Sequence, residues 1–161
     1  MIVSITGHRP EDLPNHEWVE ETLKNVLDRM RPQKLIQGMA AGVDLLSGKL
    51  CIELNIPYIS AKPWAGHLPR KEDQALYRLI ENNSETVVNV NQSKSYPGAY
   101  VYHNRNHYMV DNADIVIAVW TGKKTGGTAE CVKYAKKVNK RIIQINPETK
   151  TVTELTDETL F

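Results

Sequence analysis

Short runs rich in valine and isoleucine alternate along the chain with longer segments in which apolar residues recur every three or four positions. The first pattern is typical of β-strands and the second of amphipathic helices. We expect Asn15 to cap the first helix and Pro32, which cannot continue a helix, to follow its end. Pro69 is a candidate start for the third helix. The predicted strands are 2–5, 34–37, 57–61, 85–90, 114–120 and 141–145, and the other predicted helices are 43–55, 99–112 and 128–139.

The order of these segments indicates the fold. Strands that alternate with helices pair in parallel through right-handed crossovers. The run Asp114–Trp120 (DIVIAVW) is the most apolar and indicates a central strand buried on both faces. We therefore predict one doubly wound, Rossmann-like α/β domain with a mainly parallel sheet over residues 1–161. A weak alternation at 151–155 leaves the segment 146–161 as either an edge strand or a loose tail.

The composition is that of a soluble globular protein, since 41% of the 161 residues are hydrophobic and 24% are charged. The formal net charge of +1 provides no overall field for a polyanion, which argues against a nucleic-acid partner without excluding a local basic groove. Cys51 and Cys131 fall in different predicted helices, so we expect two reduced, buried thiols. No signal peptide and no stretch of membrane-spanning length is found, and we expect a cytoplasmic protein with no membrane partner.

Three of the loops that follow predicted strands are unusual in their glycine content. They are Thr6–Pro10 (TGHRP), Gly38–Asp44 (GMAAGVD) and Thr121–Glu130 (TGKKTGGTAE). In a parallel sheet such loops meet at the carboxyl edge, where ligands bind. Two of them lead directly into helices, whose first N–H groups and dipole favour phosphate. We therefore predict a site for a nucleotide-derived, phosphate-bearing ligand; the alternative is that the glycines only make tight turns.

The standard nucleotide-binding motifs are absent. The chain contains no GxGxxG, so the common dinucleotide fingerprint is missing. The segment Gly42–Lys49 has one residue too many between its glycines for a P-loop, and Leu50 stands where Ser or Thr would bind magnesium. We exclude a P-loop NTPase and predict no cofactor.

The candidate ligand-binding residues lie in these loops or beside them. Arg9 can make a bidentate phosphate contact, and Thr128 can bind phosphate through its hydroxyl or simply cap its helix. Trp64 and Trp120 follow strands and can stack a base, although core packing is an equal alternative for Trp120. The predicted ligand-binding residues are Gly7, His8, Arg9, Gly38, Gly42, Asp44, Trp64, Arg105, Trp120, Gly126, Gly127 and Thr128.

Two carboxylates are candidate catalytic residues if the protein is an enzyme. Asp44 and Glu130 each lie in the first turn of a predicted helix, where the helix dipole alone also explains a carboxylate. Asp44 can alternatively accept a hydrogen bond from a ribose hydroxyl, and Glu130 can stabilise an oxocarbenium-like transition state or attack it. Arg105 is a candidate phosphate or charge partner, and Asp111 can pair with it or cap a turn.

Other side chains on the fourth predicted helix have less defined roles. His103 and His107 are four residues apart, but the glutamate of HExxH is missing, and we predict no metal site. The tyrosines of this region can form either a base pocket or the interface of a homodimer or larger homo-oligomer. They are Tyr96, Tyr100, Tyr102 and Tyr108.

Four motifs together resemble the SLOG superfamily, and its YpsA-like branch in particular. They are "TGHRP", "GMAAGVD", "RNHYMVDNADIVIAVW" and "GGTAECVKYAKK", in this order along nearly the whole chain. The superfamily also contains the DNA-processing protein DprA and the Lonely Guy (LOG) enzymes. The resemblance implies a Rossmann-like fold, a nucleotide or nucleotide-derived ligand, and frequently a dimer or larger assembly.

The LOG enzymes carry PGGxGTxxE and cleave the N-glycosidic bond of nucleoside monophosphates. Here Gly126–Glu130 lacks the proline and one residue after the glycines, so Glu130 arrives one position early, about 100° away around the helix. This departure argues against hydrolysis and leaves phosphate binding intact. We therefore expect a nucleotide-binding sensor or sequestering module; the alternatives are a nucleoside-monophosphate N-glycosidase and a DprA-like binder of single-stranded DNA.

Overall fold

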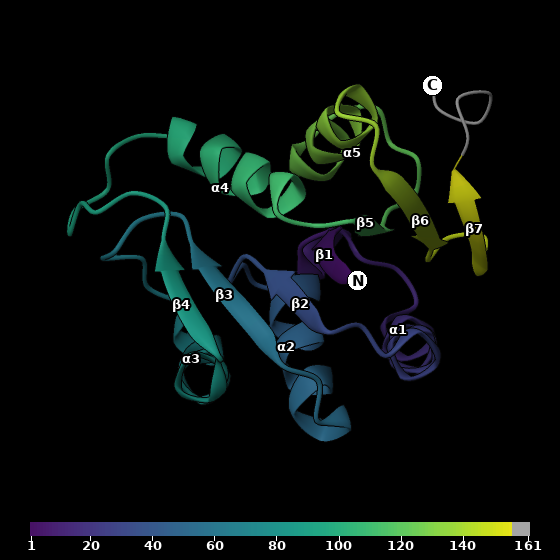
Figure 1. Ribbon diagram of the computed structural model, residues 1–161, viewed down its shortest axis with the longest axis horizontal. Helices are drawn as coiled ribbons and strands as arrows, with labels where there is room; N and C mark the ends of the chain where they lie inside the picture. Colours follow the sequence, from purple (N-terminus) through teal and green to yellow (C-terminus); the bar gives the residue numbers. More distant parts are fainter. Residues whose placement is uncertain (156–161) are drawn as a thin grey trace.

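The computed structural model describes residues 1–155 and contains a seven-stranded sheet with helices on both faces (Figure 1). The strand order is β4-β3-β2-β1-β5-β6-β7. All neighbouring strands pair in parallel except β6 and β7, which are antiparallel. The strands are β1 (Ile2–Gly7), β2 (Lys34–Gln37), β3 (Tyr58–Lys62), β4 (Thr86–Asn89), β5 (Ile115–Val119), β6 (Arg141–Asn146) and β7 (Thr151–Leu155). The predicted α/β fold with a mainly parallel sheet is confirmed.

Five α-helices and two short 3-10 helices connect the strands. Helices α1, α2 and α3 cover one face of the sheet, and α4 and α5 cover the other (Figure 1). The helices are η1 (Pro10–Asp12), α1 (His16–Met30), α2 (Val43–Leu54), η2 (Lys71–Asp73), α3 (Gln74–Asn83), α4 (Tyr100–Asp111) and α5 (Gly127–Lys137). The third helical segment therefore begins after Pro69, with η2 and then α3.

The hydrophobic core lies in two layers, one on each side of the sheet. Every residue of β5 is buried, as expected for the most apolar run of the sequence. Ile115, Ile117 and Val119 pack with α1, α2 and their neighbours, whereas Val116 and Ala118 pack with α5. Both cysteines are buried free thiols. None of the described helices combines the length and the hydropathy that crossing a membrane requires.

The path of the chain changes direction beside β1, and this positions the candidate site. From β1 to β4 each new strand is added on one side, and the chain then returns to place β5 on the other side of β1. The loops after β1 and β5 thus diverge to opposite faces, and a crevice at the carboxyl edge is expected between them.

The start of α1 differs from the sequence prediction. Asn15 adopts a left-handed backbone conformation (φ 53°) and makes no side-chain capping hydrogen bond. Its side-chain amide instead donates to the carbonyl of Pro147 at 2.8 Å. Asn15 thus occupies the N-cap position of α1, as predicted, but its side chain does not cap the helix. The end of α1 is as expected, because Arg31 closes the helix in a left-handed conformation immediately before Pro32.

The C-terminal segment forms an edge strand over the part that is described. The alternating residues at 151–155 are β7, which pairs with β6 and carries the Arg141–Glu154 ion pair at 2.8 Å. The remainder of the predicted tail, residues 156–161, lies outside the described residues.

Candidate functional site

The loops after β1 and β5 are joined directly at the crevice. The backbone N–H of Thr121 donates to Nε2 of His8 at 3.1 Å. Burial lowers the pKa of His8, the carboxylate of Asp12 opposes this effect, and Lys123 adds to it. The accepting nitrogen must be unprotonated, so the lowered pKa and the hydrogen bond agree.

The start of α5 is the most open part of this edge. Gly126 has a φ of +100°, which strongly favours glycine, and a side chain at Gly126 or Gly127 would meet no other atom within 4 Å. The first helical hydrogen bond runs from the N–H of Glu130 to the carbonyl of Gly126 at 3.1 Å. The N–H groups of residues 127–129 therefore have no acceptor within the helix. An anion can approach these N–H groups without displacing a side chain.

Exposed basic side chains lie in the two loops on this side of the edge. Lys123 and Lys124 are exposed in the loop before α5, and Arg9 is exposed in the loop after β1. Thr128 is buried in the first turn of α5, at 8% exposure. The two lysines lie within the loop selected from the sequence, although the sequence prediction gave them no role.

In the loop after β2, unlike the loop before α5, backbone N–H groups are hydrogen-bonded within the protein. Oδ2 of Asp44 accepts the N–H groups of Gly38 at 3.1 Å and of Ala40 at 3.3 Å. These N–H groups are thus satisfied within the protein. Gly42, with a φ of +92°, lies against the loop after β1, since a Cβ there would be 2.8 Å from the carbonyl oxygen of His8. The structure therefore gives Gly38 and Gly42 a packing role.

Gly7 and Val43 show the same close packing. A Cβ on Gly7 would lie 2.6 Å from the side chain of Val43, so the end of β1 and the start of α2 approach each other as only glycine permits. This contact leaves no room for a ligand at Gly7 on the side of α2.

Arg105 lies deep at the end of β2. Its Nη1 donates to the carbonyl of Gly38 at 2.9 Å and its Nε to Asn106 at 3.1 Å. Burial lowers the pKa of Arg105, while the negative charge of Asp44 opposes that shift; burial raises the pKa of Asp44, and Arg105 opposes it. Arg105 is thus a charge partner of Asp44. The predicted pairing of Arg105 with Asp111 is wrong, because Asp111 instead accepts a hydrogen bond of 2.6 Å from the hydroxyl of Tyr134.

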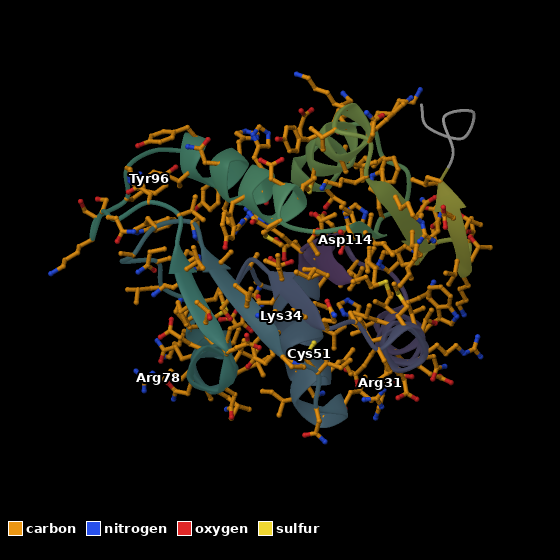
Figure 2. All side chains as sticks on the ribbon, in the orientation of Figure 1. Arg31, Lys34, Cys51, Arg78, Tyr96 and Asp114 are labelled. Carbon is orange, nitrogen blue, oxygen red and sulfur yellow. The ribbon has the colours of Figure 1, made fainter. Side chains whose placement is uncertain are left out.

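The two tryptophans have different environments. Trp64 is half-buried and makes edge contacts with His67, Tyr96 and Tyr102 at centroid distances of 4.9, 5.3 and 5.9 Å. Figure 2 labels Tyr96 beside the segment between β4 and α4, on the opposite side of the molecule from β7. Trp120 is only 4% exposed and packs in the core beneath α5, so the structure supports its packing role over base stacking.

A groove of about 270 Å³ separates α4 and α5. Glu130 is exposed at its rim, with Oε1 3.7 Å from Nζ of Lys133. The ring of His107 stacks on Tyr134 at 3.8 Å. Within residues 1–155, no cluster of three or more His, Cys, Asp or Glu side chains is suited to a metal ion. The groove residues are His103, Asn106, His107, Glu130, Cys131, Lys133, Tyr134 and Lys137.

Eight of the twelve predicted ligand-binding residues therefore fall into two groups. His8, Arg9, Gly126, Gly127 and Thr128 belong to the loops on the β1–β5 side of the edge. Gly38, Asp44 and Arg105 form a second, buried group at the end of β2.

Comparison with known proteins identifies the family. Residues 1–159 match the family model of DNA recombination-mediator protein A, and the chain belongs to this family. The match confirms the SLOG superfamily indicated by the sequence motifs. A curated relative, the uncharacterized SPbeta prophage-derived protein YoqJ of Bacillus subtilis, is 33% identical over 70 residues, which cover 38% of this chain and 40% of YoqJ.

Solved structures share the fold at low sequence identity. DNA processing protein A from Streptococcus pneumoniae matches with a TM-score of 0.72 at 16% identity, over 88% of this chain and 49% of that protein. The Helicobacter pylori protein of the same name, which has a single-stranded DNA binding mode, matches with a TM-score of 0.69 at 19% identity, over 89% and 64%. The molybdenum cofactor carrier protein of Chlamydomonas reinhardtii gives 0.59 at 17% identity, over 89% and 74%. The chain spans less than two thirds of YoqJ and of both DNA processing proteins.

Proposed function

We propose that this protein binds a nucleotide or nucleotide-derived ligand at the carboxyl edge of the sheet, with the ligand's phosphate at the start of α5. The observation that carries the proposal is the open helix start at Gly126 and Gly127, whose N–H groups lack intrahelical acceptors. Lys123, Lys124 and Arg9 add positive charge around it. A cytoplasmic sensor or sequestering module, acting as a homodimer or larger homo-oligomer, is the role we infer.

Single-stranded DNA is a second candidate ligand, and its support comes from the family. The chain belongs to the family of DNA recombination-mediator protein A, and a structural relative binds single-stranded DNA. The net charge of +1 argued against a nucleic-acid ligand. Because of these relatives, we keep single-stranded DNA as a candidate ligand. A local basic edge suffices for single-strand binding when phosphates are its main contacts.

The proposal is tested with a pair of variants at Gly127. Gly127→Asp places a carboxylate beside the N–H groups at the helix start, and Gly127→Ala is its matched control, since a Cβ at this position meets no neighbour within 4 Å. An acidic residue in the first turn favours the helix, so Gly127→Asp is expected to stay folded. Calorimetry with nucleoside monophosphates should show a rise in Kd of about tenfold or more in Gly127→Asp and little change in Gly127→Ala. Equal affinity for all three proteins would refute the proposed phosphate position.

The same titrations separate the two ligand classes. Oligothymidylates of increasing length should bind no more tightly than a mononucleotide if the ligand is a single nucleotide. Affinity that increases with length, and that falls steeply with salt, would instead support single-stranded DNA.

A further inference from the structure

Asp44 and Arg105 meet at Gly38, and each retains a hydrogen-bonding atom that the protein does not use. A Cβ on Gly38 would lie 2.7 Å from Cδ of Arg105 and 2.9 Å from Oδ2 of Asp44. Asp44 accepts two backbone N–H groups through Oδ2 alone, and Arg105 donates through Nη1 and Nε. Within the described chain, no hydrogen bond reaches Oδ1 of Asp44 or Nη2 of Arg105.

Such unused atoms are exceptional at this depth. The exposure of Asp44 is 7% and that of Arg105 is 8%, and buried polar groups are normally paired. Both atoms nevertheless keep contact with solvent, because neither is among the enclosed side-chain atoms of the described residues that lack a hydrogen bond, which are Ser4 Oγ, Glu81 Oε2 and Asn89 Oδ1. A buried carboxylate and a buried guanidinium thus each offer one atom to a ligand at the carboxyl edge.

The chemistry of the pair defines what it can bind. A guanidinium only donates hydrogen bonds and an ionised carboxylate only accepts them. The complementary group carries both a donor and an acceptor, as the N–H and C=O on the edge of a nucleobase do. Tyr102, with its ring centroid 5.7 Å from the guanidinium carbon, and Trp64, in contact with Tyr102, provide aromatic surface for a base beside the pair.

The position of the pair fits a nucleotide whose phosphate lies at α5. Gly38 follows β2 and the loop before α5 follows β5, with only β1 between these two strands. Two strand spacings amount to about 10 Å. This separation is comparable with the distance from the phosphate to the base in one mononucleotide.

We propose that Asp44 and Arg105 recognise the donor–acceptor edge of the base in the bound ligand. The inference rests on the proposed function for the position of the phosphate. The two residues that connect the end of β2 with the start of α2 and with α4 would then also determine which base is bound.

The test uses the full chain and three ligands that differ stepwise. Ribose 5-phosphate has no base, purine riboside 5′-monophosphate has a base without the N1–H and O6 groups, and inosine 5′-monophosphate has both. Calorimetry should show inosine 5′-monophosphate binding at least tenfold more tightly than purine riboside 5′-monophosphate. Equal affinity for these two ligands overturns the inference and leaves the phosphate site standing. Failure of all three to bind overturns the inference and the proposed function together.

A variant locates the recognition at Asp44. Asp44→Asn keeps one oxygen for the N–H groups of Gly38 and Ala40 and replaces the unused acceptor with a donor. The advantage of inosine 5′-monophosphate over purine riboside 5′-monophosphate should disappear, while the affinity for ribose 5-phosphate is unchanged. Asp28→Asn, at an exposed ion pair with Arg31, is the control and should retain the advantage. If Asp44→Asn also binds inosine 5′-monophosphate more tightly than purine riboside 5′-monophosphate, the inference is wrong. If this variant does not fold, the comparison of the two ligands on the natural chain still tests the inference.

Discussion

The backbone N–H of Thr121 donates a hydrogen bond of 3.1 Å to Nε2 of His8, and this contact joins the two loops on either side of the crevice. The donor is a backbone N–H group, which cannot act as a hydrogen-bond acceptor. The contact therefore exists only while His8 is neutral, and protonation of the imidazole would place two donors against each other.

Stability should consequently depend on pH through His8. Burial lowers the pKa of His8 below 6.5 in the folded protein. The unfolded state then binds more protons just below pH 6.5, so the contribution is fully present above that pH and is lost as the pH falls through the folded pKa. His8→Gln retains an acceptor but does not titrate. Urea unfolding should show a smaller loss of stability for this variant than for the natural chain between pH 7.5 and 5.5. An identical loss would contradict the assigned role.

His67 should extend the pH dependence to lower values. Burial, aided by Arg105 and Lys62, lowers its pKa from 6.5 to about 4. Its contribution is present above pH 6.5 and is lost as the pH falls toward 4, with a total on the order of 2–3 kcal/mol after allowance for partial exposure.

The matched variants for this effect are His67→Gln and His103→Gln. His67→Gln keeps a hydrogen-bonding partner for the hydroxyl of Tyr77, which lies 2.8 Å from Nδ1 of His67. His103 is exposed on α4, and its replacement should leave the natural pH profile unchanged. A profile of His67→Gln that matches the natural chain between pH 6.5 and 4 would show that His67 is not the titrating group.

Gly126 and Gly127 are neighbours with opposite expected responses to alanine. Both have open space for a side chain, but only Gly126 has a positive φ, at +100°. Gly126→Ala should lower the free energy of unfolding by about 1–2 kcal/mol because of backbone strain. Gly127→Ala should leave it equal or raise it by up to about 1 kcal/mol, since alanine favours the helix. Urea denaturation measures both; equal values for the two variants would contradict the conformation of this loop.

Local signals predicted the elements well, because each depends on residues close in sequence. The valine- and isoleucine-rich run of β5 and the helical periodicity of α1 require no knowledge of distant contacts. Asn15 lies at the N-cap position, but its side chain does not cap the helix because its amide donates to Pro147, which is 132 positions away. No local pattern carries that information.

The site shows the same limit. The glycine-rich loops were visible in the sequence, and their common edge follows from parallel pairing. Whether a loop is open or closed depends on contacts that its side chains make only in the folded chain. Asp44 satisfies the loop after β2, and Arg105 reaches Gly38 from 67 positions along the chain. The approach of both side chains to Gly38 could be read only from the structure.

The enzyme alternative leads to a direct prediction about Glu130. This side chain is exposed, and its Oε1 lies 3.7 Å from Nζ of Lys133 in the groove between α4 and α5. We expect prolonged incubation with nucleoside monophosphates to release no free base, as measured by liquid chromatography. Release of free base that disappears in Glu130→Gln, but persists in the neighbouring Lys133→Gln, would show that the protein is an N-glycosidase.

Amide chemical shifts measured during a nucleotide titration test the central claim most directly. Labelled protein titrated with inosine 5′-monophosphate should show its largest changes at the backbone N–H groups of Gly126–Ala129, with smaller changes at Arg9 and Gly38. The amides of β7 should not move. Largest changes at β7, or on the outer surface of α1, with the start of α5 unaffected would contradict a phosphate site at this helix.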